Sequence, residues 1–145
     1  MTTDQVLDAI RQEIAEEEAN TTWDNDELLE WVETSRRKLS TRGVATMASY
    51  TVVAVQGNVA YGISPDMTEV DGQLVVLHTA LQILDYIYRD RLKRGALAVT
   101  WSSGLESEST ISADASWKRM LSNRQQEFDA QLIIHRNLVA ASRPQ

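Results

Sequence analysis

Few side chains in this sequence have the type and spacing that enzyme chemistry requires. The chain has no cysteine and two histidines, His78 and His135, so thiol catalysis, zinc–thiolate sites and disulfides are excluded. Glycine-rich phosphate loops, Gly-x-Ser-x-Gly and His-Glu-x-x-His are also absent. The histidines fall in different predicted helices, and we interpret both as hydrogen-bonded residues at the edge of the core. We therefore expect a protein that is not an enzyme and binds no cofactor or metal.

The acidic residues point to a surface rather than to a catalytic site. Asp24 and Asp26 are spaced like calcium ligands, but Leu28 and Leu29 stand where a calcium loop needs oxygen ligands and a glycine. Eleven acids and one base lie within residues 1–34, whereas the rest of the chain is nearly balanced, and the net charge is −7. Such a surface repels nucleic-acid phosphates and favours basic partners, or it is simply solvated.

Length and composition predict one compact domain. The chain has 145 residues, of which 43% are hydrophobic and 24% charged, so it can fold without disulfides or metals. No stretch approaches the roughly 18 apolar residues of a membrane span, and the first residues do not resemble a signal peptide. We expect a soluble protein made in the cytoplasm, with no membrane contact.

Two helices are predicted in the acidic segment. Thr2 and Gln5 match a capping box ahead of apolar residues at helical spacing, which predicts a helix over residues 4–17. Asp24 and Glu27 form the same pattern at the start of a second helix. These positions place the acidic residues on helix surfaces.

Two longer helices are predicted in the rest of the chain. Apolar residues wrap most of the circumference of residues 73–94, which predicts a central, largely buried helix with Gly95 as its C-terminal cap. Ser112 opens a final helix over residues 113–140. One face of this helix carries a stripe that we expect to be buried, and the stripe is imperfect because Arg124 and His135 lie on it. Its members are Trp117, Met120, Leu121, Arg124, Phe128, Leu132, His135 and Val139.

Two β-hairpins are predicted between these helices. Residues 50–63 turn at Gly57-Asn58 and are stopped by Pro65, and residues 97–111 turn near Gly104. The predicted fold class is α+β, mainly α. It is a four-helix bundle-like domain over residues 1–140, with hairpins near 50–63 and 97–111 between helices two, three and four, followed by a flexible C-terminal tail at 141–145.

The order of these elements and several strings resemble the head-to-tail adaptor (connector) proteins of tailed bacteriophages. The resemblance covers most of the chain as a pattern without a catalytic string, and the 43–63 segment is more developed than in smaller members of that family. The strings are Asp4-Gln-Val-Leu-Asp-Ala-Ile-Arg11, Thr22-Trp-Asp-Asn-Asp-Glu-Leu-Leu29, Ile63-Ser-Pro-Asp66 and Val99-Thr-Trp-Ser-Ser-Gly104, with Ser109 leading into the final helix.

This resemblance implies a structural protein of the virion neck. Members of the family assemble as a twelve-fold ring, a homo-oligomer between the portal protein and the tail or nozzle proteins, and double-stranded DNA passes through the ring during packaging and ejection. The hairpins would contact neighbouring subunits or the next tail component. The C-terminal segment would bind the portal through Leu138, Val139, Ser142, Arg143, Pro144 and Gln145.

The acidic end suggests a further hypothesis about the channel. A channel wall without phosphate contacts lets DNA slide, so acids are expected on it. We expect the lining among Glu13, Glu16, Glu17, Glu18, Glu106 and Glu108. Two alternatives to the adaptor remain open: another head-closure or tail-completion protein, and an acidic cellular module that binds a basic partner.

Overall fold

The computed structural model of the chain describes residues 1–15, 23–54, 61–99 and 104–142, with side chains described outside 91, 94–99, 104–114 and 140–142. The described part is mainly helical with one small antiparallel sheet, which confirms the predicted class. The elements, in chain order, are α1 (Thr3–Glu13), α2 (Asn25–Thr41), a 3-10 helix (Ala45–Ser49), β1 (Thr51–Val53), β2 (Gly62–Ser64), α3 (Glu69–Val99) and α4 (Gly104–Ser142).

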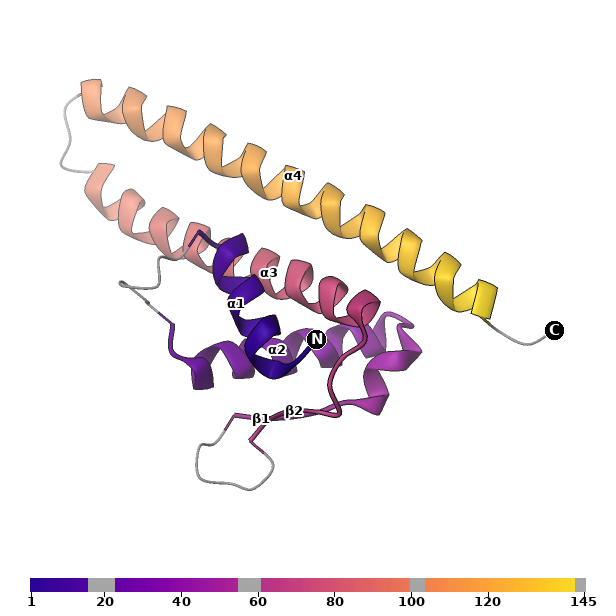
Figure 1. The fold of residues 1–145 in the computed structure, drawn as a ribbon. Coiled ribbons are helices and arrows are strands. Elements are labelled where there is room, and N and C mark those ends of the chain that lie inside the picture. The colour runs from indigo at the N-terminus through magenta and orange to yellow at the C-terminus, as the bar shows by residue number, and fades with distance from the viewer. Residues whose placement is uncertain (16–22, 55–60, 100–103, 143–145) are drawn as a thin grey trace.

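Helix α3 is the centre of the molecule, as the apolar pattern predicts. It contacts α1, α2 and α4, and α4 runs antiparallel beside it along the whole long axis (Figure 1). Leu74, Val75 and Ile83 on α3 are fully buried, and α1 and α2 cover the first part of the helix. No helix in the described ranges is both long and apolar enough to span a membrane.

The starts of α1 and α2 lie where the capping residues predict them. The Thr2 side chain accepts from the Gln5 amide at 3.3 Å, and Gln5 Oε1 accepts from the Thr2 amide at 2.9 Å. Asp24 Oδ1 accepts from the Glu27 amide at 2.8 Å. Local hydrogen bonds therefore fix both starts. The end of α1 differs, since the helix closes at Glu13 rather than at residue 17.

The first predicted hairpin is present as a short sheet. Val52 pairs with Ile63 in the antiparallel register, and β2 ends at Ser64, immediately before Pro65. The predicted turn at Gly57-Asn58 lies outside the described residues. Gly62 has φ +104°, and a Cβ there would lie 2.8 Å from Thr3 Oγ1, so only glycine lets β2 approach the start of α1 this closely.

The second predicted hairpin, over residues 97–111, is wrong. Residues 97–99 end α3 and residues 104–111 begin α4, so Gly95 is not a cap and Ser112 does not open the last helix. Alternation over seven residues is a weak signal, and an isolated two-stranded hairpin is only marginally stable. Continued helices satisfy their own backbone hydrogen bonds, and this offsets the cost of about 1 kcal/mol for a glycine inside a helix.

Candidate functional site

The side of α4 that faces the core is the predicted stripe. Its two polar members, Arg124 and His135, make contacts that hold the helix in place. Phe128, in the middle of the stripe, is fully buried. Arg124 binds the carboxylate of Glu13, and its Nη2 donates to the Glu13 carbonyl at 3.2 Å. His135 lies 11 residues further along α4 and is 3% exposed, with Nε2 2.6 Å from Asp71 Oδ1. The imperfection of the stripe therefore marks where α4 joins α1 and α3.

Asp71 is the centre of a buried hydrogen-bond network. Its Oδ2 accepts from the Tyr50 hydroxyl at 2.7 Å, and its Oδ1 accepts from Thr46 Oγ1 at 3.0 Å as well as from His135. The Tyr50 hydroxyl in turn accepts from the Thr68 amide at 3.2 Å. The network joins α3, α4 and the segment around the 3-10 helix.

The environment of Asp71 favours its charged form. Burial, the largest influence, raises the pKa of this carboxyl, but hydrogen bonds from Tyr50, His135 and Thr46 together lower the pKa below its ordinary value. Burial and the hydrogen bond to Asp71 raise the pKa of Tyr50. Both carboxylate oxygens accept hydrogen bonds, so this arrangement connects the elements that carry the donors.

The outward face of α4 carries aliphatic side chains that the core does not use. Ile133 is 60% exposed, and Ile134 and Leu138 are each 49% exposed. We call these three residues the aliphatic patch. They lie within six residues of one another near the C-terminal end of α4. Contiguous exposed apolar patches on folded proteins are typical of interaction sites.

The structure describes part of the predicted portal-binding segment. Leu138 belongs to the aliphatic patch, whereas Val139 is partly buried. Ser142 is the last residue of α4, so helix reaches into the predicted tail, and Arg143, Pro144 and Gln145 lie outside the described residues. The sequence reasoning missed Ile133 and Ile134, which could have been found as adjacent isoleucines that leave the inward stripe.

The structure describes the side chain of one of the six predicted channel acids, Glu13. Glu13 is paired with Arg124, and Glu16, Glu17 and Glu18 lie outside the described residues. Glu106 and Glu108 lie in the first turns of α4, where only the backbone is described.

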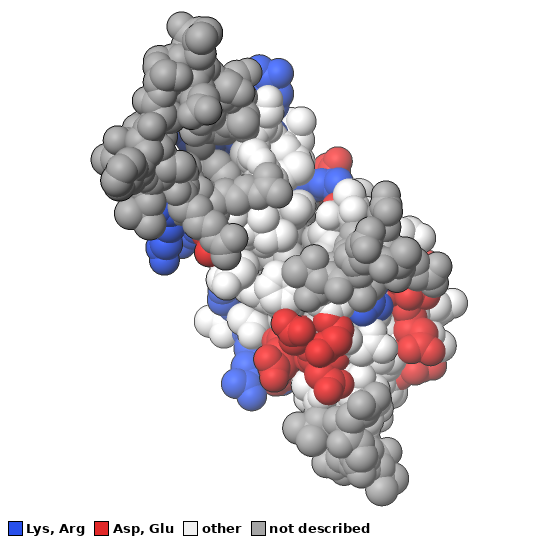
Figure 2. All heavy atoms as spheres, turned by 90° about the vertical axis from the view of Figure 1, so that its left-hand side faces the viewer, with Lys and Arg blue, Asp and Glu red and all other residues white. Residues whose placement is uncertain are grey.

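Other acids form the exposed acidic surface. Acidic side chains gather in the lower half of the face shown in Figure 2. The exposed acids of α1, of α2 and of the residue before α2 are Asp4, Asp8, Asp24, Glu27 and Glu30.

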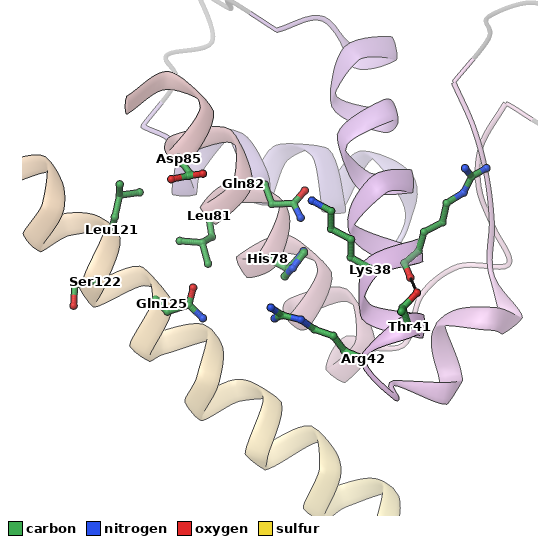
Figure 3. A pocket seen from close by; sticks show the side chains of 11 residues that line it. Lys38, Thr41, Arg42, His78, Leu81, Gln82, Asp85, Leu121, Ser122 and Gln125 are labelled. Atoms are coloured by element: carbon green, nitrogen blue, oxygen red, sulfur yellow. Dashed lines mark hydrogen bonds between the residues drawn. The ribbon is translucent and has the colours of Figure 1, made fainter. Parts of the chain in front are cut away.

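A hollow of about 730 Å³ lies between α2, α3 and α4, and we call it the basic hollow. Lys38 extends into it from α2 and Arg42 from the residue that follows α2, and His78 lies between them on α3 (Figure 3). The ring of His78 packs against Phe128, with ring centres 5.0 Å apart. Its Nδ1 atom is buried and has no hydrogen-bond partner among the described residues.

His78 is therefore not the hydrogen-bonded histidine that the sequence predicts. Burial, followed by the charges of Arg42 and Lys38, lowers the pKa of His78 from 6.5 to about 4. The ring is neutral at pH 7 and retains an unused nitrogen.

Comparison with known proteins identifies no relative: no family model, no curated protein and no solved structure matches the chain. Within the described ranges, no three His, Asp or Glu side chains are grouped so that they could hold a metal ion. The functional interpretation therefore depends on the surfaces of the molecule itself.

Proposed function

We propose that this protein is a structural subunit of the neck of a tailed bacteriophage, with no catalytic activity. It forms a homo-oligomeric ring, a dodecamer, between the portal protein and the tail or nozzle proteins, and the ring extends the channel for genome packaging and ejection. The observation that carries this proposal is the aliphatic patch of Ile133, Ile134 and Leu138 on the outward face of α4.

The aliphatic patch favours assembly because its exposure has no use in a free subunit. The inward stripe of α4 already holds the helix to the rest of the molecule through Arg124, Phe128 and His135. Burying aliphatic surface contributes about 25 cal/mol per Å², so a partner over the patch gains stability that the isolated chain does not have. The 39 residues of α4 extend about 58 Å, which lets one subunit reach a second protein.

The small sheet supports contacts between copies. It has only β1 and β2 within the described residues, so each strand has one edge that no other described strand pairs. Natural proteins cover or pair such edges, and a neighbouring subunit in a ring is one way to do so.

The acidic surface supports passage of DNA without binding. The exposed acids of α1 and α2 would repel phosphates along a channel wall. Asp4, Asp8, Glu27 and Glu30 fit this role better than Glu13, since the charge of Glu13 is opposed by Arg124.

The test is binding to the purified portal encoded in the same genome. The full chain should bind the portal and appear as a ring by electron microscopy. An Ile134→Asp/Leu138→Asp variant should lose this binding, whereas Asn137→Asp, which adds a charge at an exposed site between them, should retain it. Circular dichroism and gel filtration should show all three folded. Failure of the wild-type chain to bind, or unchanged binding of the double variant, would contradict the proposal.

The acidic surface also favours a second function, binding of a basic protein. In that case a complex with a basic partner should weaken in an Asp4→Asn/Asp8→Asn variant and at high salt, while Ile134→Asp/Leu138→Asp leaves it intact. The two functions therefore depend on different surfaces, and the same pair of variants separates them.

A further inference from the structure

We propose that the basic hollow between α2, α3 and α4 is a binding site for the phosphate group of a small phosphorylated molecule. This inference does not depend on the neck function, because the hollow and the aliphatic patch share no residue. Three features of the hollow carry it: its unbalanced charge, the unused nitrogen of His78, and the polar and apolar groups that line the remaining space.

The charge of the hollow is positive and is not neutralised within the described part of the chain. Among its lining residues, Arg37 is bound by Glu33 at 2.8 Å, and the one acid, Asp85, is bound by Arg89 at 3.1 Å. Lys38 and Arg42 also line it, and neither has a carboxylate partner among the described residues. A lysine and an arginine that converge on one hollow form a site for an oxyanion.

His78 adds a buried polar atom at the same place. The residue is 5% exposed, and its Nδ1 is without a partner in the described part of the molecule. Most buried polar atoms in folded proteins are hydrogen-bonded, so an exception calls for an explanation such as a missing ligand. Figure 3 shows the ring between the side chains of Lys38 and Arg42. An anion held by those cations would also oppose the positive potential that disfavours protonation of the ring.

The rest of the lining fits an uncharged organic part. Gln82 Oε1 accepts from Ser35 Oγ at 3.4 Å, and Ser35 Oγ itself accepts from Thr79 at 3.0 Å. This arrangement leaves the amide NH₂ of Gln82 to donate into the hollow. Leu81 and Leu121 supply apolar surface. At about 730 Å³, the hollow is larger than a phosphate ion and has the size of sites that bind small organic molecules.

The experiment is a titration of the full chain with two probes at constant ionic strength. Inorganic phosphate tests the anion site alone, and adenosine monophosphate tests the same phosphate chemistry with an organic part attached. We expect saturable binding of both by calorimetry, tighter for the nucleotide, with movement of the His78 ring resonances in the NMR spectrum. Phosphate binding that equals nucleotide binding would assign the site to free phosphate and overturn its assignment to a phosphorylated molecule.

Matched variants separate the basic hollow from general surface charge. Lys38→Ala/Arg42→Ala should weaken binding at least about tenfold, the effect of losing one or more charge-assisted hydrogen bonds. The control, Arg119→Ala/Arg136→Ala, also removes two exposed cations but lies outside the hollow and should bind as the wild type does. Lys38→Gln/Arg42→Gln repeats the test if the alanine variant unfolds. No saturable binding, equal loss in the control, or unmoved His78 resonances would overturn the proposal.

Discussion

The two histidines of this protein are equally buried but have opposite surroundings. His135 on α4 is 3% exposed and bonded to Asp71, whereas His78 on α3 is 5% exposed, has an unpartnered Nδ1 and lies near Lys38 and Arg42. The first contact connects α4 to the start of α3. His78 lines the basic hollow, and its Nδ1 makes no hydrogen bond that connects described elements of the fold. Burial alone therefore does not tell a hydrogen-bonded histidine from one with an unpartnered ring nitrogen; the charge and hydrogen-bonding capacity of the neighbours do.

The largest expected effect comes from removing the partner of His135. Asp71→Ala leaves His135, Tyr50 and Thr46 without their shared acceptor, and each buried group left without a hydrogen bond costs about 1–3 kcal/mol. Urea unfolding followed by circular dichroism measures the loss. Asp66→Ala, which removes an exposed acid nearby, should change stability by less than about 0.5 kcal/mol. A loss below 1 kcal/mol for Asp71→Ala would mean that the network does not hold α4.

The next effect is the pH dependence that His78 imposes. The pKa of His78 is lowered from 6.5 to about 4 in the folded chain, so the unfolded chain binds a proton as pH falls below 6.5 while the folded chain does not. Stability should therefore decrease between pH 6.5 and 4, by up to about 3 kcal/mol at 1.36 kcal/mol per pH unit.

A control variant and the separate pH window of Asp71 sharpen this pH experiment. His78→Gln should remove most of the decrease between pH 6.5 and 4 relative to wild type. The lowered pKa of Asp71 acts in a different window: its contribution is complete above pH 4 and is lost as pH falls below that value. A wild-type chain whose stability does not change between pH 6.5 and 4 would show that His78 is not buried as a neutral ring.

The smallest effect is the influence of the neighbouring cations on His78. Lys38→Ala/Arg42→Ala removes two charges that lower the pKa of His78 but leaves the burial that lowers it most. The pKa should rise toward 6.5 without reaching it, and NMR titration of the ring resonances measures the shift. Arg119→Ala/Arg136→Ala serves again as the control and should leave the pKa unchanged. Equal shifts in both variants would show that the effect is not specific to the hollow.

Much of the fold could be predicted because its signals are local. The capping residues at Thr2 and Asp24 act on amides three residues away, and the inward stripe of α4 follows from helical spacing. The hairpin over residues 97–111 was mispredicted because a short alternating pattern is compatible with either structure, and the continuation of α3 and α4 settles it. The aliphatic patch was missed because the exposed face of a helix is known only when the buried face has a partner.

By itself, the sequence determined the starts of α1 and α2, the mainly helical class, the central position of α3, the acidic end and the lack of known catalytic motifs. Each of these depends on residues close together in the chain or on composition. Only the tertiary structure decided that Arg124 meets Glu13, that His135 meets Asp71 and that Nδ1 of His78 has no hydrogen-bond partner among the described residues. Asp71 and His135 are 64 residues apart and Glu13 and Arg124 are 111 apart, and the packing of α4 against α1 and α3 fixes such contacts, which no local spacing encodes.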